Sequence, residues 1–284
     1  MLELKSVSFA YREGHPVVRD ISLRLPRGAR LAVMGENGSG KTTLAHLMCG
    51  LLRPVAGDVL MDGLNTSDPG SVHEIRRRVG IVFQDPDDQL IETTVEREIG
   101  FGLRNLGLVP AEVRKRVDRA LTVFSIEHLR RRPCHLLSAG EKQTVTVASI
   151  FAMKPDYVLL DESTSLLDTE SRLHLVATVE RLLTETGAGL VFVSTRLEDV
   201  WMCDRVIFLR DGSIDFDGGK EGLAAWLAEQ GFHLTGLSFL LSRMDRVLPG
   251  FGHRISSCGS LTADAVSGIL TELAGSSGGG AACL

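Results

Sequence analysis

The sequence has 284 residues, of which 44% are hydrophobic and 24% charged, a composition typical of a water-soluble protein. This length accommodates one large α/β domain, or one domain with an appendage. The formal net charge of -5 disfavours a general nucleic-acid binder, because such proteins usually have an excess of basic residues.

Membrane spans, a signal peptide and a cysteine-based site are not expected. No run reaches about 18 apolar residues, and the N-terminal residues have no long apolar core. The cysteines are scattered without a CxxC pair, which disfavours a disulfide framework or a zinc site and favours a reducing cytosol. They are Cys49, Cys134, Cys203, Cys258 and Cys283.

Short β-like runs open the chain at residues 2–11, 21–25 and 30–35. The third run leads into a glycine-rich turn and a helix that begins near Lys41. A second strand–turn region covers residues 57–63 and 79–84.

The middle and later parts of the chain alternate between helical and strand patterns. Three helices are predicted at 95–106, 110–124 and 138–153, followed by strands at 157–161, 189–194 and 205–210. The dipeptide Asp211-Gly212 predicts a hairpin between the last strand and residues 213–218. The pattern predicts an α/β core with an inserted helical segment.

Residues 35–42, GENGSGKT, match the phosphate-binding pattern GxxxxGK[ST] between a predicted strand and a predicted helix. Glycines let backbone N–H groups face phosphate oxygens, and the helix dipole favours the same anion. Lys41 is expected to reach the β- and γ-phosphates, and Thr42 to ligate Mg²⁺. The predicted nucleotide-binding residues from this loop are Gly35, Glu36, Asn37, Gly38, Ser39, Gly40, Lys41, Thr42 and Thr43.

An apolar run at 157–160 ends in two adjacent acids, Asp161 and Glu162. Asp161 at the strand tip is suited to hold Mg²⁺ through water, and Glu162 to polarise an attacking water. A solvated acidic turn is the plain alternative, which the phosphate loop upstream disfavours.

Residues 137–143, LSAGEKQ, open a helix about twenty residues before the acid pair. They resemble the LSGGQ signature of ATP-binding-cassette (ABC) ATPases, and further motifs follow in that family's order over residues 1–230. The resemblance implies that Tyr11 stacks on adenine, that Gln84 contacts Mg²⁺ and senses a transmembrane partner, and that Asp168 makes a dimer contact. It also implies that the signature residues act on the partner subunit's nucleotide; these are Ser138, Ala139, Gly140 and Glu141. Independently of the family, Ser138 and Glu141 have the spacing of a capping box.

More narrowly, residues 85–108 and 262–273 resemble the ATPase subunits of energy-coupling-factor importers for vitamins and metal ions. The implied fold is an ABC nucleotide-binding domain over 1–230. It comprises an N-terminal antiparallel β subdomain, a RecA-like core and a helical subdomain at about 85–155. A helical extension is expected at 231–274 and a disordered tail at 275–284.

The sequence departs from the family pattern at four positions. Ala139 replaces a signature glycine, Glu141 replaces glutamine and Thr144 replaces arginine. Arg196 stands where the family has a catalytic histidine; arginine keeps the cation but cannot shuttle a proton. Three roles are open to Arg196: pairing with Asp161 or Glu162 and silencing the site, clamping the γ-phosphate with slow turnover, or supporting hydrolysis as an arginine finger.

The resemblance implies a transport-coupled ATPase that uses ATP and Mg²⁺, with a second ABC subunit and integral membrane subunits as partners. The chain itself is expected to lie peripherally on the cytoplasmic face of the membrane. It is not expected to have a nucleic-acid partner. Slow hydrolysis at its own site, in a heterodimer, is the favoured interpretation of Arg196. The alternatives are a non-hydrolytic, nucleotide-gated subunit and, less favoured, a soluble ABC protein that acts on nucleic acid or ribosomes.

Overall fold

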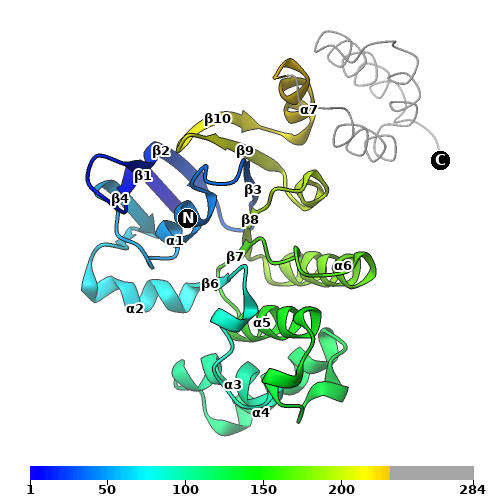
Figure 1. Cartoon of the computed structure of the whole chain (residues 1–284). Helices are drawn as coiled ribbons and strands as arrows, with labels where there is room; N and C mark the ends of the chain where they lie inside the picture. Colours follow the sequence, from blue (N-terminus) through cyan, green and yellow to red (C-terminus); the bar gives the residue numbers. More distant parts are fainter. Residues whose placement is uncertain (231–284) are drawn as a thin grey trace, which may run out of the picture.

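The computed structural model describes residues 1–230, and the helical extension and tail predicted at 231–284 lie outside the described residues (Figure 1). The first sheet has four strands in the order β2-β1-β4-β5, with antiparallel pairing throughout. Its strands are β1 (Leu2–Ala10), β2 (Pro16–Leu25), β4 (Ala56–Met61) and β5 (Leu64–Asn65). The predicted antiparallel sheet is therefore present, although β2 begins five residues earlier than the run at 21–25 indicated.

The second sheet has six strands in the order β10-β9-β3-β8-β7-β6, all parallel to their neighbours except β10. They are β3 (Arg30–Gly35), β6 (Val79–Val82), β7 (Tyr157–Asp161), β8 (Gly189–Val193), β9 (Arg205–Arg210) and β10 (Ser213–Gly218). Every residue of β7 and β8 is buried, because helices or the other sheet cover both faces.

Alternating side chains of the parallel strands enter two separate hydrophobic cores. Leu159 and Val191 pack in the core shared with the first sheet and α1 (Lys41–Met48). Val158 and Phe192 pack in the core shared with the helices of the opposite face. The phosphate loop thus connects a strand and a helix that are both anchored in packed structure.

The helices predicted between residues 94 and 154 are confirmed as α3 (Val95–Asn105), α4 (Pro110–Val123) and α5 (Ala139–Met153), and they gather beside the β6 edge of the sheet (Figure 1). The structure adds three helices that the sequence analysis did not assign: α2 (Pro69–Arg78), α6 (Thr169–Thr186) and α7 (Lys220–Glu229). In α6, buried Leu175, Val179, Leu182 and Leu183 follow helical spacing, so the signal was present but interrupted by polar residues. Within residues 1–230, no helix combines the length and apolar character needed to cross a membrane.

The Asp62 carboxylate links the first sheet to the N-terminal amino group and to two arginines. Its carboxylate accepts from the Met1 amino group, from Arg27 Nη2 at 2.8 Å and from Arg78 Nη1 at 3.3 Å. The hydrogen bonds from the amino group and Arg27 lower the pKa of Asp62 to about 2. We therefore expect Asp62→Asn to lower the free energy of unfolding at pH 7 by about 1 kcal/mol, after allowance for solvent screening.

Because the folded-state pKa is depressed below 3.8, this stabilisation is present above that pH and is lost as the pH falls towards about 2. Urea unfolding at pH 7 and at successively lower pH measures the difference between the two proteins. Asp20→Asn is the matched control, because exposed Asp20 has the same positive φ of 47° as Asp62. An Asp62→Asn penalty that does not shrink in acid would contradict this account.

Candidate nucleotide-binding site

The phosphate loop lies between the end of β3 and the start of α1 and requires glycine at two points. Gly35 has φ 148°, and a Cβ there would lie 2.4 Å from Leu209 O. Gly40 caps α1 in the left-handed region at φ 100°, and a Cβ there would lie 2.6 Å from Val17 O. Any side chain at either position would clash with backbone, so the loop conformation depends on these residues.

Two polar side chains within the loop are buried and suited to an anion. Lys41 Nζ donates to Gly35 O at 3.0 Å and to Glu36 O at 2.9 Å, and burial lowers the pKa of Lys41. Ser39 Oγ is buried without a hydrogen-bond partner in the described part of the chain. A buried hydroxyl is rarely left unsatisfied, so a phosphate oxygen at this point would satisfy it. An open pocket of about 370 Å³ adjoins the loop and is lined by Val17, Asn37, Gly38, Gly40, Lys41, Thr42, Thr43, Gln84 and Glu162.

The predicted acid pair lies beside the loop. Asp161, at the end of β7, is 1% exposed and accepts a hydrogen bond from Thr42 Oγ1 at 3.2 Å. Burial raises the pKa of Asp161 to about 6; the charge of Glu162 acts in the same direction, whereas the Thr42 hydrogen bond and the charge of Lys41 oppose it. Asp161 and Thr42 thus place a buried carboxylate next to a hydroxyl group. Both are hard oxygen donors of the kind that Mg²⁺ prefers, and the cation would compensate the buried charge.

Glu162 leaves the direction of the strand, because its φ of 46° is in the left-handed region. Its backbone N–H donates to Val193 O at 3.0 Å, and its side chain accepts from Gln84 Nε2 at 2.9 Å. The structure therefore brings Gln84, Thr42, Asp161 and Glu162 together at one end of the parallel strands. In open α/β sheets, ligands bind at the carboxyl ends of the parallel strands, which is where these residues lie.

Tyr11 lies beside the first turn of α1, which follows the phosphate loop. Its hydroxyl is 3.2 Å from Thr43 Oγ1, and its ring makes a T-shaped contact with the ring of Phe9, with centroids 4.9 Å apart. Tyr11 is 61% exposed, so much of the residue remains accessible to solvent. A ring held at the mouth of a phosphate site is suited to stack on a base.

The signature segment opens α5 as predicted. Ser138 is the N-cap, its Oγ accepts from Glu141 N at 3.3 Å, and the Glu141 carboxylate accepts from Ser138 N at 2.7 Å. The capping box is thus confirmed, and the hydrogen bond from the Ser138 N–H lowers the pKa of Glu141. Ala139 is the first helical residue and lacks a positive φ, so its methyl group does not strain the backbone.

The signature residues do not line the pocket beside this chain's own phosphate loop. Within residues 1–230, no hydrogen bond or ion pair joins residues 138–141 to residues 35–43. A connection that the sequence analysis missed instead joins α5 to the segment after Gln84. Lys142 Nζ contacts both carboxylate oxygens of Asp87, at 2.6 and 2.8 Å. The Asp87 side chain remains 65% exposed, so this ion pair lies at the protein surface.

The two remaining predicted residues are at the starts of later helices. Asp168 caps α6, accepting from Glu170 N and Ser171 N at 3.0 Å each. Arg196 precedes the 3-10 helix η4 (Leu197–Met202), and its backbone N–H donates to Ser194 Oγ at 3.0 Å. Arg196 is exposed and lies just beyond the end of β8.

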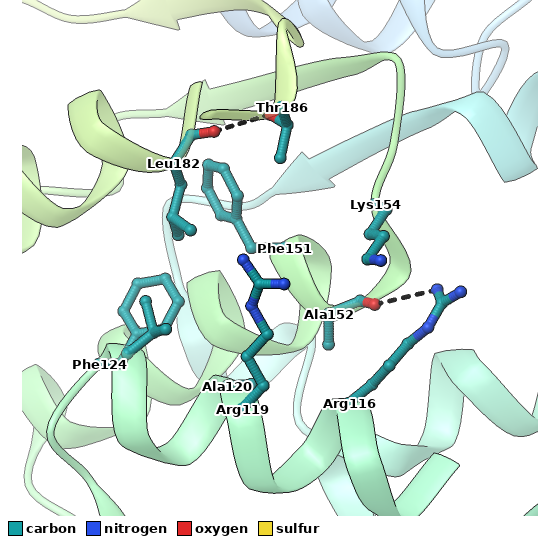
Figure 2. Close-up of a pocket in the computed structure, with 10 residues that line it drawn as sticks. Arg116, Arg119, Ala120, Phe124, Phe151, Ala152, Lys154, Leu182 and Thr186 are labelled. Carbon is teal, nitrogen blue, oxygen red and sulfur yellow. Dashed lines mark hydrogen bonds between the residues drawn. The ribbon is translucent and has the colours of Figure 1, made fainter. Parts of the chain in front are cut away.

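A second pocket, which is mostly apolar, lies at the carboxyl ends of α5 and α6 (Figure 2). Phe124, Phe151 and Leu182 form its apolar wall, and Arg116 Nη1 donates to Ala152 O at 3.4 Å. Cations next to helix carboxyl ends are explained by those carbonyls and by the helix dipole. This pocket shares no lining residue with the phosphate-loop pocket, so we assign it no part in nucleotide binding.

The parallel sheet, the glycine loop and the acid pair define a P-loop nucleoside triphosphatase. The family model described as "ABC transporter" matches residues 18–165, about half of the sequence. The cobalt import ATP-binding protein CbiO of Syntrophus aciditrophicus is 41% identical over 248 residues, covering 86% of this chain and 88% of the relative. The chain belongs to the ABC transporter family and is an ABC ATPase.

Two further comparisons support this placement. An energy-coupling factor transporter ATP-binding protein, EcfA1, of Caldanaerobacter subterraneus is 39% identical over 222 residues, 77% of this chain and 80% of the relative. The structure of CbiO1 from Clostridium perfringens, described as part of the transporter complex CbiONQ, matches with a TM-score of 0.74 at 30% identity. That match covers 90% of this chain and 98% of the solved one.

Proposed function

We propose that this chain is the ATP-binding subunit of an energy-coupling-factor-type importer, and that it works with a second ABC subunit and with integral membrane subunits. The observation that carries the proposal is that, within residues 1–230, no hydrogen bond or ion pair joins two segments that each favour an anion. One is the phosphate loop with Asp161 and Glu162, and the other is the Ser138 helix start, which has its own anion-favouring N–H groups and dipole. A second cassette, facing the first, would complete each half-site.

The comparisons support a dimeric arrangement of this kind. The ABC cassette MJ0796, bound to ADP and Pi, was solved as a dimer; it matches this chain with a TM-score of 0.72 at 27% identity and covers 77% of it. The names of the CbiO and EcfA1 relatives assign those proteins to cobalt import and to an energy-coupling factor transporter. We extend the transport role to this chain, with a peripheral location on the cytoplasmic face of the membrane.

Each residue of the site then has a distinct part. The loop N–H groups and Lys41 hold the phosphates, and Tyr11 stacks on the base. Thr42, Asp161 and Gln84 would hold Mg²⁺, which neutralises phosphate charge as the bond to the γ-phosphate breaks. Glu162, held by Gln84 at 2.9 Å, orients and polarises the attacking water.

Arg196 gives this site a slower turnover than a histidine would. A guanidinium has five donors and no acceptor, so it binds a γ-phosphate but cannot accept a proton. The partner subunit supplies a more competent site, to which this chain contributes Ser138 and Gly140. The second candidate, a non-hydrolytic subunit gated by nucleotide, is favoured by the same arginine.

Purification of the native complex from membranes tests the transport role. We expect tagged full-length chain to co-purify with a second ABC subunit and at least one multi-helix integral membrane protein. Isolation of the chain with ribosomes or nucleic acid instead would contradict the proposal. Single-turnover hydrolysis of Mg·ATP by the same preparation separates the importer ATPase from the non-hydrolytic candidate.

A further inference from the structure

Asp199 is a buried carboxylate outside the nucleotide pocket, and it joins three separate segments of the chain. It is 2% exposed and accepts from Ser194 Oγ at 2.6 Å, from Thr164 Oγ1 at 3.3 Å and from Arg172 Nη1 at 3.3 Å. The three donors are themselves buried. The sequence analysis gave none of these four residues a role.

Each segment joined by Asp199 adjoins a residue of the proposed site. Thr164 follows Glu162 by two positions, and Arg172 lies in the first turn of α6, which Asp168 caps. Ser194 ends the β8 region two positions before Arg196. Its Oγ accepts from Arg196 N at 3.0 Å while donating to Asp199, so both functions of the hydroxyl are used.

Breaking the hydrogen bonds around Asp199 would cost free energy. Burial raises the pKa of Asp199, whereas the hydrogen bond from Ser194 and the charges of Arg172 and Arg196 oppose this change. If one segment moved, a buried charged or polar group would lose a partner in a medium of low dielectric constant. The three segments are therefore held in a fixed relation to one another.

We propose that Asp199 is a positioning residue for ATP turnover, which acts through Ser194 to place the backbone at Arg196 relative to the segment that Asp199 contacts at Thr164 and Arg172. The inference rests on the proposed function, since it requires ATP at the phosphate loop. Asp199 does not touch the nucleotide in this account. It determines where the Arg196 side chain begins relative to Glu162, and misplacement by about 1 Å lowers turnover substantially.

A mutant cycle between Asp199 and Arg196 tests the inference on the full-length chain, read out by single-turnover hydrolysis and by the affinity for a fluorescent Mg·ATP analogue. We expect Asp199→Asn to lower the hydrolysis rate about 10-fold with an analogue affinity within about twofold of wild type. In the Arg196→Ala background, Asp199→Asn is expected to change the rate by less than about twofold. A purely structural role would give the same loss in both backgrounds.

Ser194→Ala is the second test variant, because it removes only the hydroxyl between Asp199 and Arg196 and is decisive if Asp199→Asn does not fold. It is expected to show the same dependence on Arg196. Asp217→Asn is the matched control, since Asp217 also pairs with an arginine, Arg205, but on the distant β9–β10 hairpin. Its turnover should equal that of wild type.

The outcomes distinguish failure of the role of Asp199 from failure of the proposed function. Equal losses in both backgrounds, or hydrolysis that does not depend on Arg196, overturn the role of Asp199 and leave nucleotide binding intact. Failure of the wild-type chain to bind the analogue overturns the proposed function itself.

Discussion

Lys41→Met is expected to lower the affinity for Mg·ATP by about 100-fold or more. The Lys41 ammonium group is buried and already held by the carbonyls of Gly35 and Glu36, so it meets the phosphates without further ordering. Hydrogen bonds between charged groups contribute about 1.5–3 kcal/mol each, and about 1.4 kcal/mol corresponds to a tenfold change in affinity. Isothermal titration with Mg·ATP measures the loss.

This loss is not expected to reflect unfolding. Burial lowers the pKa of Lys41, so the ligand-free fold holds this charge at a cost that methionine avoids. The melting temperature without nucleotide should therefore fall little. Lys5→Ala is the matched control, because exposed Lys5 pairs with Glu3 on β1 and should bind Mg·ATP as wild type does. Unchanged affinity in Lys41→Met would mean that residues 35–42 do not enclose the triphosphate.

The sequence predicted the parts of the fold that follow local patterns. The apolar runs at 157–161 and 189–194 became parallel strands buried on both faces, and the glycine loop lies between β3 and α1 as expected. The strand order was not predictable from local pattern, since β3 pairs with β8 and β9 from the far end of the domain. Helix α6 was missed because polar residues interrupt its apolar spacing.

The candidate site likewise has parts that local sequence patterns predicted and parts that they did not. Residue types and spacing predicted Lys41, Thr42, Asp161 and Glu162, which the structure brings together. The contacts of Lys142 with Asp87 and of Asp199 with Arg172 link residues 55 and 27 positions apart. Such pairs carry no local signal, because a lysine on a helix or an aspartate in a loop is ordinarily a solvated residue. Only the topology of the sheet brings their segments into contact.

Arg196→His is expected to raise the single-turnover rate of ATP hydrolysis by about 100-fold while leaving the affinity for Mg·ATP within about threefold. Loss of one well-placed transition-state contact typically costs about 10²–10³ in rate, and histidine at this position would restore one. The affinity changes little because Lys41 and the loop N–H groups hold the phosphates in both proteins. Rapid-quench hydrolysis with excess enzyme measures the rate of the chemical step.

The side chains themselves supply the controls for this comparison. Arg196→Lys keeps a permanent cation without a proton acceptor, so its hydrolysis rate should stay as low as that of wild type. If the size of the side chain alone determined the rate, the lysine variant would be accelerated as well. The histidine variant should also gain a pH dependence near about pH 6.5, where imidazole titrates and guanidinium does not. If the wild-type chain hydrolyses ATP as fast as its histidine variant, the interpretation of Arg196 as the cause of slow turnover is wrong. A more competent partner subunit would then not be required, because two copies of this chain could form an active dimer.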